Sequence, residues 1–355
     1  MIRSRLTGGA VLVAGVCLAA GTLQAQAPLV TSPFESYLEL LRQQAGIPGM
    51  SAVIVQNGEI VWERGLGWQN VEARIRATPD TPYPIADITG TLASTLVLEC
   101  TEQRRILLDQ QASRYGVSLP ESDATVREVL NHSSAAPAGE AFHYDPDRYG
   151  QLSRVIESCV PQPFRKTIAV QLLERLAMKD SVPGRDVQQE SVTSQNLFAT
   201  SVQERYKDVL DRVAVPYKVD KKGRSTRAEL PTESFSASTG IVSTVRDLAR
   251  FDAALDSLLL LREDTLAAAW TGTTGRDKVL PTGLGWFVQK YNAETVVWQF
   301  GMMTNGYSSL ILKLPARRLT LILLANSDGL SSPFDLPSGD VTKSLFAVLF
   351  LRLFG

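Results

Sequence analysis

The sequence predicts an α/β fold of the α+β kind, in which an antiparallel sheet flanked by helices adjoins a mostly helical subdomain. Two observations carry this prediction. Short apolar segments typical of strands occur near both ends of the chain, whereas the long middle carries apolar residues at helical spacing. Strands at both ends of a helical middle imply one sheet assembled from sequence-distant segments. We expect a sheet subdomain of about 28–85 and 240–355 and a helical subdomain of about 86–239.

The first expected elements are a helix and a hairpin. Residues 33–45 carry apolar side chains at helical spacing, and the segment Gly46-Ile47-Pro48-Gly49 ends this pattern. Two strands are expected at 51–56 and 59–66, because Asn57-Gly58 between them is the strongest short hairpin signal. The first strand is apolar on both sides, so we expect the sheet to be covered on both faces.

The rest of the chain predicts a helical middle and a return to strands. Helices are expected at 88–105, 126–130, 149–159, 167–176 and 242–261. The polar and basic segment 218–227 is interpreted as a solvated loop rather than a binding patch. Strands are expected at 285–290, 295–299, 307–313 and 319–325. A closing helix at about 341–354 contains Arg352 and is too short to span a bilayer, so we expect it to pack on the sheet.

The amino-terminal segment is interpreted as an export signal. Arg3 and Arg5 precede an apolar run, and small residues follow near 23–27, so residues 1–27 are expected to be a cleaved signal peptide. An uncleaved anchor or a lipid attached at Cys17 is the alternative. The mature domain, 28–355, is then periplasmic or secreted, with no membrane span of its own. The formal net charge of −1 gives no electrostatic reason to expect a nucleic acid partner.

Two cysteines remain after the signal, Cys100 and Cys159, and both lie in predicted helices. They could pair in an oxidising compartment, but free buried cysteines are the preferred interpretation. The chain has two histidines, His132 and His143, and neither has a ligand-type partner at helical spacing. No metal and no other cofactor is therefore expected.

Motifs along most of the chain point to one known family. They occur at 46–49, 116–134, 176–181, 239–251, 283–286 and 306–309. In this order, across about residues 36–326, they resemble the serine β-lactamase and penicillin-binding-protein family, in particular its class C-like esterase and peptidase branch. The resemblance implies that family's fold. It also implies a cell-wall peptide or a small ester-like molecule as the ligand of the cleft.

The positions that would carry catalysis depart from the family pattern. The resemblance implies a Ser-x-x-Lys turn, but Asp87 and Gly90 stand at the serine and lysine positions, and neither can do that chemistry. The family's Tyr-x-Asn corresponds to a segment that keeps Tyr144 but has Pro146 in place of asparagine. The third motif, Lys-Thr-Gly or His-x-Gly, aligns with Gln299-Phe300-Gly301. Tyr144 is therefore expected to be a packed aromatic residue with a satisfied hydroxyl.

Asp87 has two interpretations that involve no acyl transfer. The preferred one is an N-cap, in which its carboxylate accepts from the amide of Thr89 or Gly90 at the start of a helix. The other is that Asp87-Ile88-Thr89-Gly90-Thr91 matches the Asp-x-Thr-Gly-Thr of aspartyl-phosphate enzymes. That match lacks the apolar strand and the acidic loop that phosphoryl transfer needs.

Three functions are compatible with these residues. The preferred hypothesis is an exported pseudoenzyme, which keeps the fold but has lost the catalytic serine and lysine and acts as a binding protein. A structural or interaction protein with a filled cleft is the second. The third is a serine hydrolase with rearranged catalytic residues, in which Ser133, Ser238 or Thr89 is the nucleophile and Tyr144 or His132 the base.

Overall fold

The computed structural model describes residues 27–135, 137–229, 234–276 and 278–355. The segment predicted to be a signal peptide, 1–27, lies outside the described residues except for Ala27, where helix α1 (Ala27–Gln44) begins. This helix starts earlier than the predicted 33–45.

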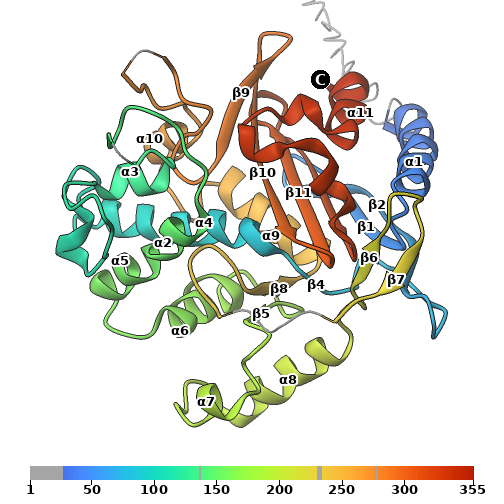
Figure 1. Cartoon of the computed structure of the whole chain (residues 1–355), viewed down its shortest axis with the longest axis horizontal. Coiled ribbons are helices and arrows are strands. Elements are labelled where there is room, and N and C mark those ends of the chain that lie inside the picture. The colour runs from blue at the N-terminus through green and yellow to red at the C-terminus, as the bar shows by residue number, and fades with distance from the viewer. Residues whose placement is uncertain (1–26, 136, 230–233, 277) are drawn as a thin grey trace, which may run out of the picture.

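A seven-stranded antiparallel sheet forms the centre of the molecule (Figure 1). Its strand order is β3-β2-β1-β12-β11-β10-β9. The strands are β1 (Gly49–Gln56), β2 (Glu59–Asn70), β3 (Ile75–Arg76), β9 (Phe287–Tyr291), β10 (Glu294–Met303), β11 (Tyr307–Leu314) and β12 (Leu319–Ala325). The two sequence-distant halves meet where β1 pairs with β12, with Met50 opposite Ala325. The predicted α+β fold, with one sheet built from both ends of the chain, is therefore confirmed.

The hairpin between β1 and β2 turns at the predicted dipeptide. Asn57 and Gly58 have φ values of 54° and 82°, the left-handed conformations that a type I′ turn requires. The turn fixes the register, in which Gln56 lies opposite Glu59.

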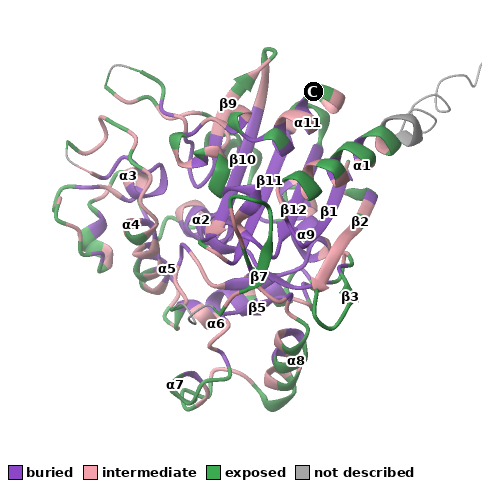
Figure 2. Ribbon diagram, turned by 45° about the vertical axis from the view of Figure 1, so that its right-hand side comes forward, coloured by how far each residue is buried: buried purple, intermediate pink, exposed green. Residues whose placement is uncertain are grey.

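Helices cover both faces of the sheet, as predicted. Helices α1 and α11 (Leu345–Phe354) lie on one face, where they pack on alternate strand residues such as Ala52 and Ile54. Helices α2 (Thr89–Glu102) and α9 (Val245–Asp256) lie on the other face, against residues such as Val53 and Val55. Figure 2 shows the central strands as the most buried part of the chain. None of the described helices is both long and apolar enough to cross a bilayer.

The segment between the two halves of the large sheet is mostly helical. It contains α2, α3 (Val126–Leu130), α4 (Pro146–Gly150), α5 (Leu152–Cys159), α6 (Phe164–Ile168) with a π-helical continuation (Ala169–Glu174), α7 (Glu190–Thr193) and α8 (Thr200–Asp211). Helix α10 (Glu263–Ala269) follows α9. A short sheet of β4 (Tyr83–Pro84), β8 (Ile241–Ser243) and β5 (Val182–Pro183) connects this region to the rest.

Two sequence predictions need correction in this region. The helix predicted at 242–261 begins instead after strand β8, because Thr244 is extended and its side chain accepts from the amide of Asp247 to cap α9. The segment predicted as a solvated loop, 218–227, contains a hairpin of β6 (Tyr217–Val219) and β7 (Ser225–Arg227). The carboxylate of Asp220 accepts from the amides of Lys222 and Arg224, and these bonds close the turn.

Cys100 and Cys159 form a disulfide, so the expectation of two free cysteines is wrong. Helices α2 and α5 pack against each other, and their ends bring the two Cα atoms to 6.2 Å. This separation lies within the range that a disulfide spans. Which helix ends meet is a tertiary property that helical periodicity alone does not reveal.

A buried lysine lies between the sheet and α9. The side chain of Lys313, on β11, is fully buried, and its ammonium pairs with Asp252 at 2.9 Å and with Asp256 at 2.8 Å. It also donates to the hydroxyl of Thr320 at 3.0 Å. Burial is the main cause that raises the pKa of Asp252, and the positive charge of Lys313 opposes it. The ion pairs hold α9 against the strands beneath it.

Candidate functional site

The structure brings five of the six predicted site positions around one small cavity. Asp87, Gly90, Tyr144, Pro146 and Gln299 line it, together with His132, Tyr149 and Ser238. The cavity has a volume of only about 10 Å³. That is at the lower limit for holding a single water molecule. The residues therefore meet as the family resemblance predicts, but around almost no free space.

Asp87 lies in a 3₁₀ turn, Ala86–Ile88, that precedes α2. Its Oδ2 accepts a hydrogen bond of 3.1 Å from the backbone amide of Met302 on β10. The expectation that Asp87 caps α2 is wrong, because the 3₁₀ turn puts Ile88 at the N-cap position and that cap has no side-chain hydrogen bond. The carboxylate instead connects the turn to the strand beside it.

The space beside Gly90 is filled by the ring of Tyr149. A Cβ atom at position 90 would lie 3.1 Å from Cε1 of Tyr149, which is tighter than most contacts of real Cβ atoms. The Tyr149 hydroxyl donates to the backbone carbonyl of Gly90 at 3.1 Å. Its ring stacks on His132, with centroids 4.9 Å apart. Sequence reasoning missed Tyr149, and the only signal was the glycine that leaves room for it.

Tyr144 packs among aromatic rings, as predicted. Its ring centroid lies 4.7 Å from that of His132, 5.3 Å from Phe300 and 5.8 Å from Phe287. Burial raises the pKa of the Tyr144 phenol well above its usual value. The negative charge of Asp87 and a hydrogen bond with its side chain raise this pKa further. The phenol therefore stays protonated and is satisfied by the carboxylate.

His132 is neutral in this environment. Burial lowers its pKa to about 3, while the charge of Asp145 acts in the opposite direction. Its Nδ1 accepts from the amide of Asp145 at 3.4 Å. The histidine lies between Tyr144 and Tyr149, and both rings pack against it.

Pro146 has a structural role at the start of α4. Asp145 caps this helix, and its carboxylate accepts from the amide of Arg148 at 3.0 Å. Proline is favoured at the first helical position, because its fixed φ suits the helix and its missing N–H would have no helical partner there. Pro146, at the position where the family resemblance implies an asparagine, thus starts a helix.

On β10, Gly301 permits a close approach of the strand to the Asp87 turn. A Cβ atom at position 301 would lie 2.3 Å from the carbonyl oxygen of Ile85 and 2.4 Å from Oγ of Ser309. Neighbouring Gln299 is buried, and its Oε1 accepts from the amide of Phe300 at 3.0 Å. The glycine is therefore required for packing, whether or not it also serves a ligand.

The three hydroxyls proposed as alternative nucleophiles differ in position. Ser133 is fully buried and donates to Oδ1 of Asn131 at 2.6 Å. Thr89 is also fully buried, and its hydroxyl accepts from the amide of Ile241 at 3.3 Å. Ser238 lines the cavity, and its Oγ lies 3.1 Å from Oγ of Ser236. Among the described residues, no three side chains of His, Cys, Asp or Glu gather as metal ligands.

Comparison with known proteins agrees with the fold. A family model described as Beta-lactamase matches residues 34–343. Protein flp of Staphylococcus aureus (strain MW2) is 23% identical over 330 residues, an alignment that covers 80% of this chain and 60% of flp. The chain thus spans about 60% of the length of this curated relative.

Two solved structures resemble the chain over nearly all of its length. An octameric penicillin-binding protein homologue from Pyrococcus abyssi superposes with a TM-score of 0.72 at 22% identity, covering 91% of this chain and 77% of the homologue. A class C beta-lactamase superposes with a TM-score of 0.69 at 19% identity, covering 93% of this chain and 98% of the enzyme. At these identities the likeness establishes the architecture.

Proposed function

The chain belongs to the beta-lactamase family, and from this premise we propose that it is a non-catalytic member, an exported binding protein whose family cleft is closed by its own side chains. The observation that carries the proposal is the hydrogen bond from the Met302 amide to the Asp87 carboxylate. Acyl transfer needs backbone N–H donors that face the developing oxyanion. Here the backbone N–H of Met302, which lies beside the Asp87 turn, already donates to the carboxylate of Asp87.

The packing around Gly90 supports the same proposal. A catalytic lysine at this position would need the volume that the Tyr149 ring fills. The cavity of about 10 Å³ admits neither an amide nor an ester substrate. Loss of the nucleophile and its base costs several orders of magnitude in rate even where substrate still binds.

The remaining candidate bases have unsuitable pKa values. Efficient proton transfer needs a pKa near the working pH. The pKa of His132 is about 3, so its imidazole is a weak base at neutral pH. The pKa of Tyr144 is raised by burial and by Asp87, so its phenolate is not populated. In the family pattern a lysine stands near the tyrosine, whereas here its charged neighbour is an anion, which has the opposite effect.

A serine hydrolase with rearranged residues is the second candidate. The observation that favours it is that Ser238 lines the same cavity as His132 and Tyr144. This candidate requires Ser238 to transfer its proton to one of those two groups, and their pKa values oppose that transfer.

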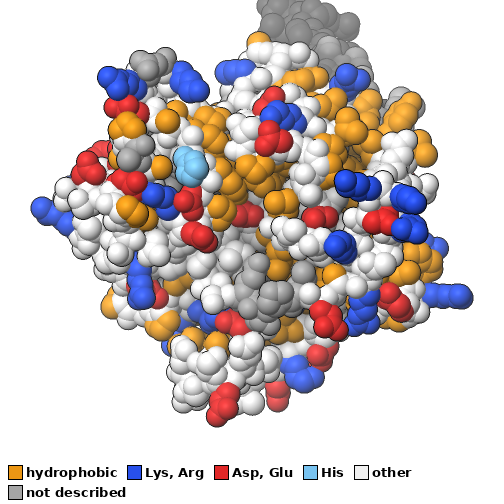
Figure 3. All heavy atoms as spheres, in the orientation of Figure 1, with side chains coloured by type: hydrophobic (Ala, Val, Ile, Leu, Met, Phe, Trp, Pro, Cys, Tyr) orange, Lys and Arg blue, Asp and Glu red, His pale blue; other side chains and the backbone are white. Residues whose placement is uncertain are grey.

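Export and partner are part of the proposal. Residues 1–27 have the composition of a signal peptide, and the Cys100–Cys159 disulfide suits the oxidising periplasm or extracellular space. Acidic and basic side chains are interspersed on the face drawn in Figure 3, which supports a partner other than nucleic acid. A cell-wall peptide or small ester-like ligand, as the family suggests, would need a surface other than the closed cavity.

The test is intact-mass spectrometry of residues 28–355 after incubation with benzylpenicillin and with a fluorophosphonate. Hydrolysis of a chromogenic cephalosporin and of a short-chain aryl ester is measured on the same samples. We expect no covalent adduct and no turnover above buffer, with an active class C beta-lactamase as the control for the reagents.

Two variants sharpen this experiment. Ser238→Ala should behave as the parent chain, and any adduct or turnover that it abolishes would establish the rearranged hydrolase instead. The double change Asp87→Ser with Gly90→Lys should remain inactive, because the Tyr149 ring obstructs the new side chain. An adduct on the parent chain at any serine or threonine would overturn the non-catalytic proposal.

A further inference from the structure

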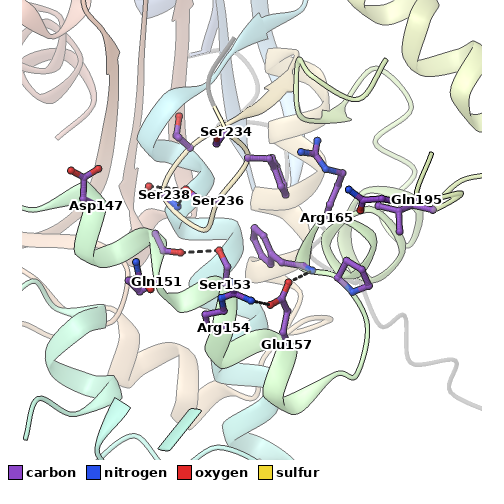
Figure 4. Close-up of a pocket in the computed structure, with 16 residues that line it drawn as sticks. Asp147, Gln151, Ser153, Arg154, Glu157, Arg165, Gln195, Ser234, Ser236 and Ser238 are labelled. Carbon is purple, nitrogen blue, oxygen red and sulfur yellow. Dashed lines mark hydrogen bonds and ion pairs between the residues drawn. The ribbon is translucent and has the colours of Figure 1, made fainter. Parts of the chain in front are cut away.

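A much larger pocket lies next to the closed cavity. It has a volume of about 910 Å³ and is lined by α4 and α5, the start of α6, Gln195 and Leu197, and the segment 234–239 (Figure 4). Ser238 lines both this pocket and the small cavity. A volume near 900 Å³ is in the range of pockets that hold ligands of drug-like size.

Hydroxyl groups are the commonest polar groups of the pocket lining. They belong to Ser153, Ser234, Ser236, Ser238 and Thr239. Ser153 connects the two walls, because its Oγ donates to the carbonyl of Gly150 on α4 and accepts from the amide of Ala237, both at 2.8 Å. The Oγ atoms of Ser236 and Ser238 are 3.1 Å apart, and either can donate. A hydroxyl can donate one hydrogen bond and accept two, so these hydroxyls suit a ligand that carries both hydrogen-bond donors and acceptors.

Both arginines of the lining are paired with an acid. The lining contains two arginines, Arg154 and Arg165, and two acids, Asp147 and Glu157. Arg165 makes a paired contact with Asp186, at 2.7 and 2.8 Å. Arg154 pairs with Glu157 at 3.3 Å. An anionic ligand would therefore find no unpaired arginine, and Asp147, which has no ion pair within the described part of the chain, adds a negative charge that disfavours an anion.

An apolar wall completes the pocket. Phe235 and Phe164 stack with ring centroids 5.2 Å apart, and the guanidinium of Arg165 lies 4.7 Å from the centroid of the Phe235 ring. Pro163 and Leu197 lie on the same lining, so a ligand meets these two side chains and the edge of the Phe235 ring. A ligand that fits must present apolar C–H surface to these side chains and hydroxyl groups to the serines and the threonine of the same lining. A sugar ring has both, because its C–H groups and its hydroxyls occupy different sides of the ring.

We propose that this pocket binds a neutral saccharide of one or two rings. The amides of Gln151 and Gln195, which also line the pocket, supply further uncharged donors and acceptors. The inference rests on the proposed binding function, but it places the ligand outside the closed cavity and needs no catalytic residue. Saccharide binding and covalent reactivity can therefore fail independently.

The test is a titration of residues 28–355 by isothermal calorimetry and saturation-transfer NMR with cellobiose, maltose and N,N′-diacetylchitobiose. Glucosamine and glucuronate serve as cationic and anionic sugars. We expect at least one neutral disaccharide to bind with a dissociation constant of about 1 mM or tighter. We expect glucuronate to bind at least tenfold more weakly, and glucosamine to bind no more tightly than the neutral disaccharides.

Variants then place the site. Gln151→Trp puts a bulky ring among the lining residues and should abolish binding, whereas Gln103→Trp, at an exposed position after α2, should leave it unchanged. Ser236→Ala combined with Ser238→Ala removes two hydroxyls and should weaken binding about tenfold, the loss of roughly one hydrogen bond's free energy. Melting curves of each variant confirm folding. Absence of binding by all three disaccharides, preference for a charged sugar, or binding that survives Gln151→Trp would overturn the inference.

Discussion

The Cys100–Cys159 disulfide should make a large contribution to stability. It joins residues 59 apart in sequence. In the chain-entropy model, closing a loop of this length stabilises the folded state by about 4 kcal/mol. The entropy of unfolding is about 2.1 cal/mol/K per residue, or roughly 0.7 kcal/mol/K for the described domain. Removing the disulfide should therefore lower the Tm by about 6 °C.

Differential scanning calorimetry of residues 28–355, with and without reductant, measures this effect. Cys100→Ala combined with Cys159→Ala should melt close to the reduced parent, and reductant should not change it further. Both cysteines lie in the hydrophobic core, so the alanines also remove buried sulfur atoms and add a packing loss, which the comparison with the reduced parent separates from the effect of the disulfide. The reasoning is refuted if the parent and the double variant melt within about 1 °C without reductant. Two free thiols in the denatured, unreduced parent would refute the disulfide itself.

Three further changes test other parts of the structure. Lys313→Met should lower the free energy of unfolding, measured in urea, by about 3–5 kcal/mol, because it leaves two buried aspartates unpaired. The control Lys207→Met, which removes an exposed ion pair, should change this free energy by less than about 0.5 kcal/mol. Gly301→Ala should cost about 1–3 kcal/mol in the same assay, because the added methyl group would overlap a carbonyl oxygen. The pKa of His132 is about 3 in the folded protein and about 6.5 in the unfolded chain. As the pH falls, the imidazole therefore takes up a proton in the unfolded chain before it does so in the folded protein, and the free energy of unfolding decreases below about pH 6.5. His132→Asn should therefore reduce the loss of stability between pH 7.5 and pH 5 by about 2 kcal/mol. Equal pH profiles for the parent chain and this variant would contradict the assignment.

The fold was largely predictable because its strands carry local signals. The Asn57-Gly58 turn and the apolar runs of the last third located six of the seven strands of the large sheet to within a few residues. The first residue of a helix was less predictable where a strand is followed directly by the N-cap residue, as at Thr244 between β8 and α9. Helix α8 escaped prediction because it buries only Tyr206 and Val209 and is otherwise polar.

The site was predictable in its membership but not in its contacts. The family order of motifs identified Asp87, Gly90 and Tyr144, which do meet. The Asp87 carboxylate accepts from the backbone amide of Met302, which is 215 residues further along the chain. Every residue except proline has such an amide, so a sequence motif cannot identify this contact. Tyr149 reaches Gly90 across 59 residues, and nothing in the local sequence distinguishes it from other helical tyrosines.

The replacements at the site form two coupled pairs, which explains why single reversions should fail under the proposed function. Gly90 and Tyr149 share one volume, so a lysine at 90 would have to displace a ring that also stacks on His132. Asp87 satisfies both the Met302 amide and the Tyr144 phenol, so a serine there would leave part of that hydrogen bonding unmade. Each substitution toward the family pattern thus removes a native contact before it can contribute any chemistry. Under the two proposals together, the closed cleft contributes to stability as packed core, and a ligand binds in the open pocket beside it.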